Sequence, residues 1–118
     1  MNLQQIFNNA WNGAKSKGFS LSMNYNTCQY RDKNGNCCAI GWSIPDDKYD
    51  PSMEGSGIQD NQKVKHLLAY RGSIHHLVSL QECHDKPALQ LEYAKVEQNY
   101  ERNLRQFAED HDLKIPGE

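Results

Sequence analysis

A stripe of apolar side chains at the start of the chain most constrains the fold. Apolar residues recur there at three- and four-residue spacings, the pattern of one face of an amphipathic helix. The stripe consists of Leu3, Ile6, Phe7, Ala10, Trp11 and Ala14. Asn2 and Gln5 have the spacing of a capping box, and Gly18 suits the left-handed residue that ends many helices. The pattern therefore predicts a helix within residues 1–18 that packs one face into a core.

An Asn-Gly pair in the next part of the chain indicates a β-hairpin. Residues 27–31 and 37–42 have strand-like composition on either side of this pair. Asn-Gly is a strong hairpin signal because both residues tolerate positive φ. The sequence therefore predicts a hairpin over residues 27–42, preceded by a loop. A two-residue turn at Asn-Gly would place Arg31 opposite Cys38.

Three further helices are predicted in the second half of the chain from helix-start signals and apolar spacing. They cover residues 58–72, 73–86 and 87–111. Ser56 and Gln59 form a capping box before the first. Pro87 is placed at the first position of the last, where proline is tolerated and where it would separate that helix from the one before.

The last predicted helix carries a long stripe at near-heptad spacing. The stripe consists of Leu89, Tyr93, Val96, Tyr100, Leu104 and Phe107. Such a stripe either packs into the core or pairs with another chain, since aromatic side chains concentrate binding energy. We therefore hold open a homodimer through the C-terminal helix.

Length and pattern together predict a single α+β domain over residues 1–118. The chain is near the usual size of one domain. We expect a predominantly helical fold of about four helices with a small β-hairpin. Residues 43–57 form an acidic turn and loop between the hairpin and the second helix.

Charge and hydropathy exclude several classes of function. Thirteen lysines and arginines against fifteen acids give a net charge of −2, whereas proteins that hold nucleic acids usually have a basic excess. The chain has no apolar run of about 18 residues and no basic start followed by an apolar block. We therefore expect a cytoplasmic protein with no membrane or nucleic-acid partner.

Acidic side chains gather in the turn after the predicted hairpin. The candidate binding residues of this turn are Asp46, Asp47, Tyr49, Asp50 and Glu54. Two readings stay open for Asp46 and Asp47. They cap a short helical turn, or the acids form a recognition surface for a basic partner or a weak divalent-cation site next to a glycine-rich loop.

Cysteines and histidines are the other chemistry-bearing residues. Weak candidates for a zinc site are Cys28, Cys37, Cys38, Cys83 and His84. Their spacing contains no Cys-x-x-Cys pair, so we expect free thiols, no metal and no cofactor. The predicted register also places Cys28 too far from Cys37 for a disulfide. A cysteine nucleophile assisted by His75, His76 or His84 is the alternative.

The segment from Cys38 to Gly55 resembles a known family signature. It reads Cys-Ala-Ile-Gly, two residues, Ile-Pro-Asp, two residues, Tyr, three residues, Met-Glu-Gly. This pattern is similar to that of a family of small proteins from bacteria and tailed phages. Cys28, Tyr30 and Arg31 upstream, with His84-Asp85 downstream, extend the resemblance over about residues 3–90. The resemblance implies a phage or bacterial context and no particular activity.

Two functions follow as hypotheses. The first is a small non-catalytic accessory protein of phage or prophage type that binds and modulates a host or defence macromolecule, with inhibition as the expected effect. The second is a protein that binds a small ligand such as a nucleotide or metal, or a Cys/His-dependent hydrolase. Its site would lie where the turn from Cys38 to Gly55 meets His84 and Asp85, which makes these two residues candidates as well.

Overall fold

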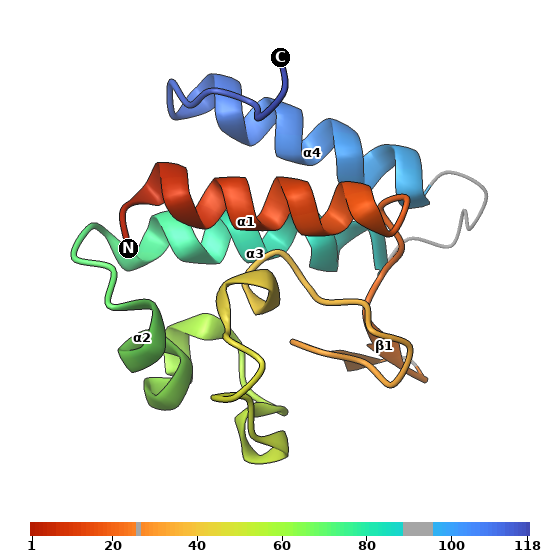
Figure 1. Ribbon diagram of the computed structural model, residues 1–118, viewed down its shortest axis with the longest axis vertical. Coiled ribbons are helices and arrows are strands. Elements are labelled where there is room, and N and C mark those ends of the chain that lie inside the picture. The colour runs from red at the N-terminus through yellow and green to blue at the C-terminus, as the bar shows by residue number, and fades with distance from the viewer. Residues whose placement is uncertain (26, 89–95) are drawn as a thin grey trace.

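The fold is α+β and dominated by helices, as the sequence predicts. The computed structural model describes residues 1–25, 27–88 and 96–118 (Figure 1). Its α-helices are α1 (Leu3–Ser16), α2 (Gln62–Leu68), α3 (Ile74–Ala88) and α4 (Val96–Asp110). The short 3-10 helices are η1 (Gly41–Ser43), η2 (Pro51–Met53) and η3 (Ile58–Asp60). Strands β1 (Met23–Asn24) and β2 (Thr27–Cys28) pair antiparallel. No helix in the described ranges is long and apolar enough to cross a membrane.

Helices α1, α3 and α4 fill one half of the molecule, and α2, the sheet and the 3-10 helices fill the other (Figure 1). Aromatic rings join the helices. The Phe7 ring of α1 stacks on Phe107 of α4 with centroids 6.1 Å apart. Tyr100 and Leu104 of α4 are also fully buried. Tyr100, Leu104 and Phe107 of the C-terminal stripe therefore pack into the chain's own core. Val96 is only partly buried, and Leu89 and Tyr93 lie outside the described residues.

Both predicted end signals of the first helix are confirmed. The Asn2 side chain accepts from the Gln5 backbone N–H, and the Gln5 side chain accepts from the Asn2 backbone N–H. Gly18 follows the helix at a φ of +61°. These are the capping box and the left-handed end that the spacing predicted.

The predicted hairpin over 27–42 is wrong in position and register. The strands cover residues 23–24, which the sequence assigned to a loop, and 27–28, and Arg31 forms an isolated bridge with Cys37 instead of Cys38. The Asp32 side chain accepts from the backbone N–H of Asn34 and of Asn36, which closes a longer loop around the Asn-Gly pair. The chain then turns into η1 in place of a strand.

The helix predicted over 58–72 is split. Residues 58–60 form η3, and α2 begins only after Asn61, whose side chain accepts from the Val64 backbone N–H. Asn61 therefore caps the helix, not Ser56. The helix ends at Leu68, and the next residue, Ala69, is left-handed at a φ of 48°.

Pro87 does not separate two helices. α3 runs through it to Ala88, although proline cannot donate to the carbonyl of Cys83, four residues earlier. The Asn103 side chain of α4 donates to this carbonyl instead, at 3.3 Å. A contact from twenty residues away therefore lets the helix continue. Residues 89–95 of the predicted last helix lie outside the described residues.

Candidate functional site

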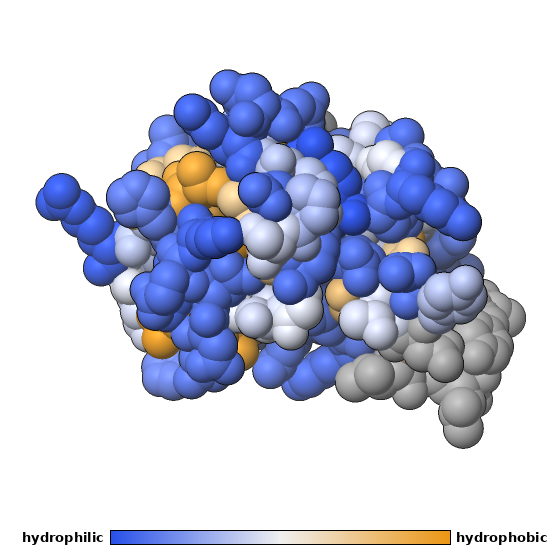
Figure 2. Space-filling model, turned by 90° about the horizontal axis from the view of Figure 1, so that it is seen from below, coloured by the Kyte–Doolittle hydropathy of each residue, from blue (hydrophilic) through white to orange (hydrophobic). Residues whose placement is uncertain are grey.

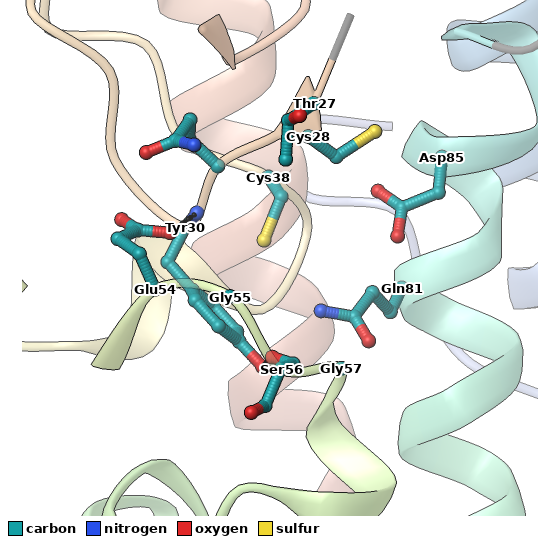
Figure 3. Close-up of a pocket in the computed structure, with 11 residues that line it drawn as sticks. Thr27, Cys28, Tyr30, Cys38, Glu54, Gly55, Ser56, Gly57, Gln81 and Asp85 are labelled. Atoms are coloured by element: carbon teal, nitrogen blue, oxygen red, sulfur yellow. Dashed lines mark hydrogen bonds between the residues drawn. The ribbon is translucent and has the colours of Figure 1, made fainter. Parts of the chain in front are cut away.

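Gln81 and Asp85 lie one turn apart on α3, so their side chains share one face of the helix. Both line a cavity of about 230 Å³. Cys38 and residues 27–30 form a second wall, and the loop over residues 54–57 forms the third (Figure 3). Four separate stretches of the sequence therefore meet at this cavity.

Hydrogen bonds to side chains fix the loop against the other walls. The Tyr30 hydroxyl donates to the Ser56 carbonyl at 2.7 Å. The Ile58 backbone N–H donates to Gln81 Oε1 at 2.9 Å. Since this bond occupies the Gln81 oxygen, the amide nitrogen points toward Tyr30 and Cys38 (Figure 3). The cavity is thus preformed, with an amide donor on its α3 side.

His84 is fully buried next to Asp85, with 0% of its side chain exposed. Its Nε2 atom lies 2.8 Å from the Ser22 backbone nitrogen, which can only donate, so Nε2 accepts and has no proton. The ring proton therefore lies on Nδ1, which donates to Asp85 Oδ1 at 2.7 Å. The ring also packs edge-on against Tyr100. His84 is thus a neutral cross-link between α3 and the segment before β1.

The Asp85 carboxylate is the charged group on the α3 side of the cavity. Its side chain is 31% exposed, and its partners are the His84 N–H and the Cys28 thiol, both of which are neutral donors. In the described part of the chain, no lysine or arginine forms an ion pair with it. Its negative charge contributes to raising the pKa of Cys28 and of Cys38.

The thiols are held in their neutral form. Burial, with a further contribution from Asp85, raises the pKa of the Cys28 thiol to about 12. Burial also raises the pKa of Cys83 to about 12 and that of Cys38 well above its usual range. A thiol nucleophile needs the opposite shift, produced by a neighbouring base or positive charge. None of the described cysteines is hydrogen-bonded to a histidine, and His76 instead contacts the Tyr70 hydroxyl.

The structure separates the predicted zinc ligands. Ligand atoms of Cys28 and His84 lie within 4.8 Å of each other and of an Asp85 oxygen. Cys83 instead faces α4, and Cys37 lies next to Arg31. All four cysteines are free thiols, as the sequence predicted.

Hydrogen bonding at His84 argues against a metal at the remaining cluster. A metal on Nδ1 would move the ring proton to Nε2. There it would face the Ser22 N–H, which is itself a donor. Metal-binding histidines usually have an acceptor at this second position. The donor set as it is bonded here therefore does not fit a metal ion.

The acidic turn is held to the rest of the chain by Arg31. The Arg31 guanidinium pairs with Asp46 at 2.9 Å and lies 4.8 Å from the centre of the Tyr49 ring. The Asp46 side chain is nevertheless 97% exposed, and Asp47 is exposed as well. The face of the molecule seen in Figure 2 is largely hydrophilic. These two acids remain accessible to a partner.

Asp50 and Glu54 have structural partners. Asp50 accepts from the Ser52 backbone N–H at 2.8 Å and so caps η2, and this bond lowers the Asp50 pKa. Glu54 accepts from the backbone N–H groups of Tyr30 and Arg31, at 2.9 and 3.2 Å, and from the Tyr49 hydroxyl at 2.7 Å. Helix capping in this turn is therefore the role of Asp50, and Glu54 clamps the turn to the segment after β2.

The structure brings together some predicted site residues and adds one that the sequence analysis missed. Cys38 and Glu54 line the same cavity as Asp85, whereas Asp46 and Asp47 lie outside it. Gln81 was not identified, although its spacing of four residues from Asp85 on a predicted helix was a usable signal.

A scan against protein-family models, a search of curated protein sequences and a search of solved structures each found no significant match. The resemblance described above therefore stays a prediction, and the site is interpreted from its geometry.

Proposed function

We propose that this protein binds a small molecule noncovalently in the cavity between residues 27–30, residues 54–57 and α3. The observation that carries the proposal is Asp85, a carboxylate that lines a preformed cavity with only neutral hydrogen-bond partners among the described residues. Convergent polar groups in a concave site are typical of ligand-binding proteins. The raised thiol pKa values favour binding over nucleophilic catalysis.

A plugging variant tests the proposal. Thr27 lines the cavity from β2 and is otherwise exposed, so Thr27→Phe is expected to fill the mouth of the cavity and keep the strand, where aromatic residues are tolerated. Small fragments titrated into ¹⁵N-labelled protein should shift the Gln81 and Asp85 amide signals of the wild type and of Thr27→Val. The same fragments should bind Thr27→Phe at least about tenfold more weakly. Equal binding to Thr27→Phe, or no fragment that shifts these signals, contradicts the proposal.

Binding of a macromolecule is the second candidate, and Tyr25 favours it. Tyr25 lies between β1 and β2, is 95% exposed and has a φ of +55°, which is unusual for a bulky residue. Strained, exposed aromatic residues are good interface anchors. The exposed acids Asp46 and Asp47 add a surface for a basic partner. In the phage context of the resemblance, this partner would be a host or defence protein in the bacterial cytoplasm.

A tagged pulldown from bacterial lysate separates this candidate from simple ligand binding. The wild type is expected to retain one stoichiometric partner, and Tyr25→Ala is expected to lose it, because truncation of an aromatic anchor typically costs about 2 kcal/mol or more. Lys33→Ala, at another exposed position, is the control and should retain the partner. Recovery of no stoichiometric protein, or equal recovery by Tyr25→Ala, would remove the candidate.

A further inference from the structure

We propose that the cavity selects small organic cations, which bind Asp85 through an ammonium or guanidinium group. This inference rests on the proposed function and specifies the class of its ligand. The ligand would also have a hydrogen-bond acceptor close to its positive charge, for the amide of Gln81.

The charge of the cavity wall supports a cation. The described lining residues include two carboxylates, Asp85 and Glu54, and no lysine or arginine. Two basic residues are adjacent in the sequence to lining residues. Arg31 directs its guanidinium to Asp46 and to the Ile44 carbonyl, and Lys86 pairs with Glu82. A wall of one sign attracts ligands of the opposite charge. An anion would be repelled, and a neutral donor would replace the lost water of Asp85 with bonds only about half as strong as those of a cation.

The free lone pairs of Asp85 support a donor with several N–H groups. An ionised carboxylate has about four lone-pair sites. His84 Nδ1–H and the Cys28 thiol occupy two of them. The others can accept two N–H donors from an ammonium or guanidinium group, and such charge-assisted bonds are about twice as strong as neutral ones.

Gln81 supplies the second contact. Its oxygen accepts from the Ile58 N–H, and its amide nitrogen has two N–H groups. One of them faces the Tyr30 hydroxyl, and the other remains for a ligand in the cavity. This donor lies one helical turn from Asp85. It can therefore bind a carbonyl of the ligand while the cationic group of the same ligand binds Asp85. The volume of about 230 Å³ is below the roughly 300–1,000 Å³ of drug-sized sites. The cavity therefore suits a compact ligand or a head group.

Matched pairs of probes test the charge requirement. Glycinamide and methylguanidinium are the cations, and N-acetylglycinamide, methylurea and acetate are the neutral and anionic counterparts. In NMR titrations of the wild type, both cations should shift the Gln81 and Asp85 amide signals at concentrations where the counterparts do not. Their affinity should fall with added salt because a charge pair is screened.

Asp85→Asn is the decisive variant, with Asp47→Asn as the matched control. The amide introduced by Asp85→Asn keeps an oxygen that can accept from His84, so the fold is expected to survive, as unchanged amide signals from α1 would verify. Cation affinity should fall by about tenfold or more in Asp85→Asn. It should stay within about twofold in Asp47→Asn, because Asp47 is exposed and outside the cavity. If Asp85→Asn does not fold, the comparison of cationic with neutral and anionic probes on the wild type alone tests the charge requirement.

The outcomes separate this inference from the proposed function. Neutral or anionic fragments that bind in the cavity as well as the cations would overturn the inference and leave the proposed function standing. Stoichiometric Zn²⁺ at Cys28 without binding of either organic cation would overturn it as well. If no probe and no fragment reaches the cavity, both fail.

Discussion

Glu54→Ala is expected to destabilise the protein by about 3 kcal/mol or more, a large effect for a partly exposed residue. One carboxylate accepts three hydrogen bonds here, from the backbone N–H groups of Tyr30 and Arg31 and from the Tyr49 hydroxyl. Its removal leaves these partly buried donors without a partner, and each such loss costs roughly 1–3 kcal/mol. Chemical denaturation of the wild type and the variant, compared at equal slope, measures the loss.

Two further variants show whether the clamp is the cause. Tyr49→Phe removes one of the three bonds and should cost about 1 kcal/mol. Glu54→Gln should lie between the two, because its amide NH₂ replaces one accepting oxygen and faces a donor. Asp47→Asn, at an exposed acid, should stay within about 0.5 kcal/mol of the wild type. A Glu54→Ala protein as stable as Asp47→Asn would contradict the clamp and return Glu54 to the set of residues free to bind a partner.

Glu54 shows what the sequence could not reveal about the acidic turn. The composition of the turn correctly identified a group of acids, but it did not show which residue each acid contacts. Glu54 reaches residues more than twenty positions earlier, and Asp46 reaches Arg31. Hydrophobic periodicity and charge counts report on neighbours along the chain, so they do not separate an acid that holds the fold from one that faces solvent.

Elements whose signals are local were predicted well. The helix α1 has its own capping box and apolar stripe, and each of these signals joins residues no more than four positions apart. The α+β class follows from several such elements together. The hairpin failed because the Asn-Gly signal competes with a side chain, Asp32, that accepts from two backbone N–H groups of the same loop. The register around this loop therefore depends on whether the Asn-Gly turn or the hydrogen bonds to Asp32 are stronger.

The predicted end of α3 was wrong, and the reason lies far away in the sequence. Proline normally stops a helix, and the sequence has no sign that Asn103 will satisfy the freed Cys83 carbonyl. The sequence likewise predicted only part of the cavity. The turn from Cys38 to Gly55 was expected near His84 and Asp85, and the structure places Cys38, Glu54 and Asp85 around one cavity. Whether that cavity binds a ligand stays a prediction.

The neutral thiols lead to a second large effect, the loss of stability in alkali. The pKa values of Cys28, Cys37, Cys38 and Cys83 are all raised, chiefly by burial. The thiol of an unfolded chain has a pKa of about 8.5. A thiol whose pKa is higher than this in the folded state contributes its full stabilisation at pH values below the unfolded pKa. Above that pH the unfolded chain releases the proton while the folded chain keeps it, so the unfolded state binds fewer protons and the stability falls as pH rises.

The slope of this fall is the measurable quantity. Each thiol that ionises only in the unfolded state removes about 1.4 kcal/mol per pH unit. Cys38 and Cys83, both buried, should together remove on the order of 4 kcal/mol about one and a half pH units above the unfolded thiol pKa. Chemical denaturation between about pH 7 and about pH 10, with a reductant present to prevent disulfides, gives the free energy of unfolding at each pH.

Cys83→Ala separates ionisation from packing. The substitution lowers stability at every pH because it removes buried atoms, but it should also reduce the alkaline slope by about one proton, since one raised pKa is gone. A packing effect alone shifts the whole curve and leaves its slope unchanged. Stability that is flat from about pH 8 to about pH 10 in the wild type would mean that the thiols ionise equally in both states. In that case the argument against a cysteine nucleophile would lose its basis.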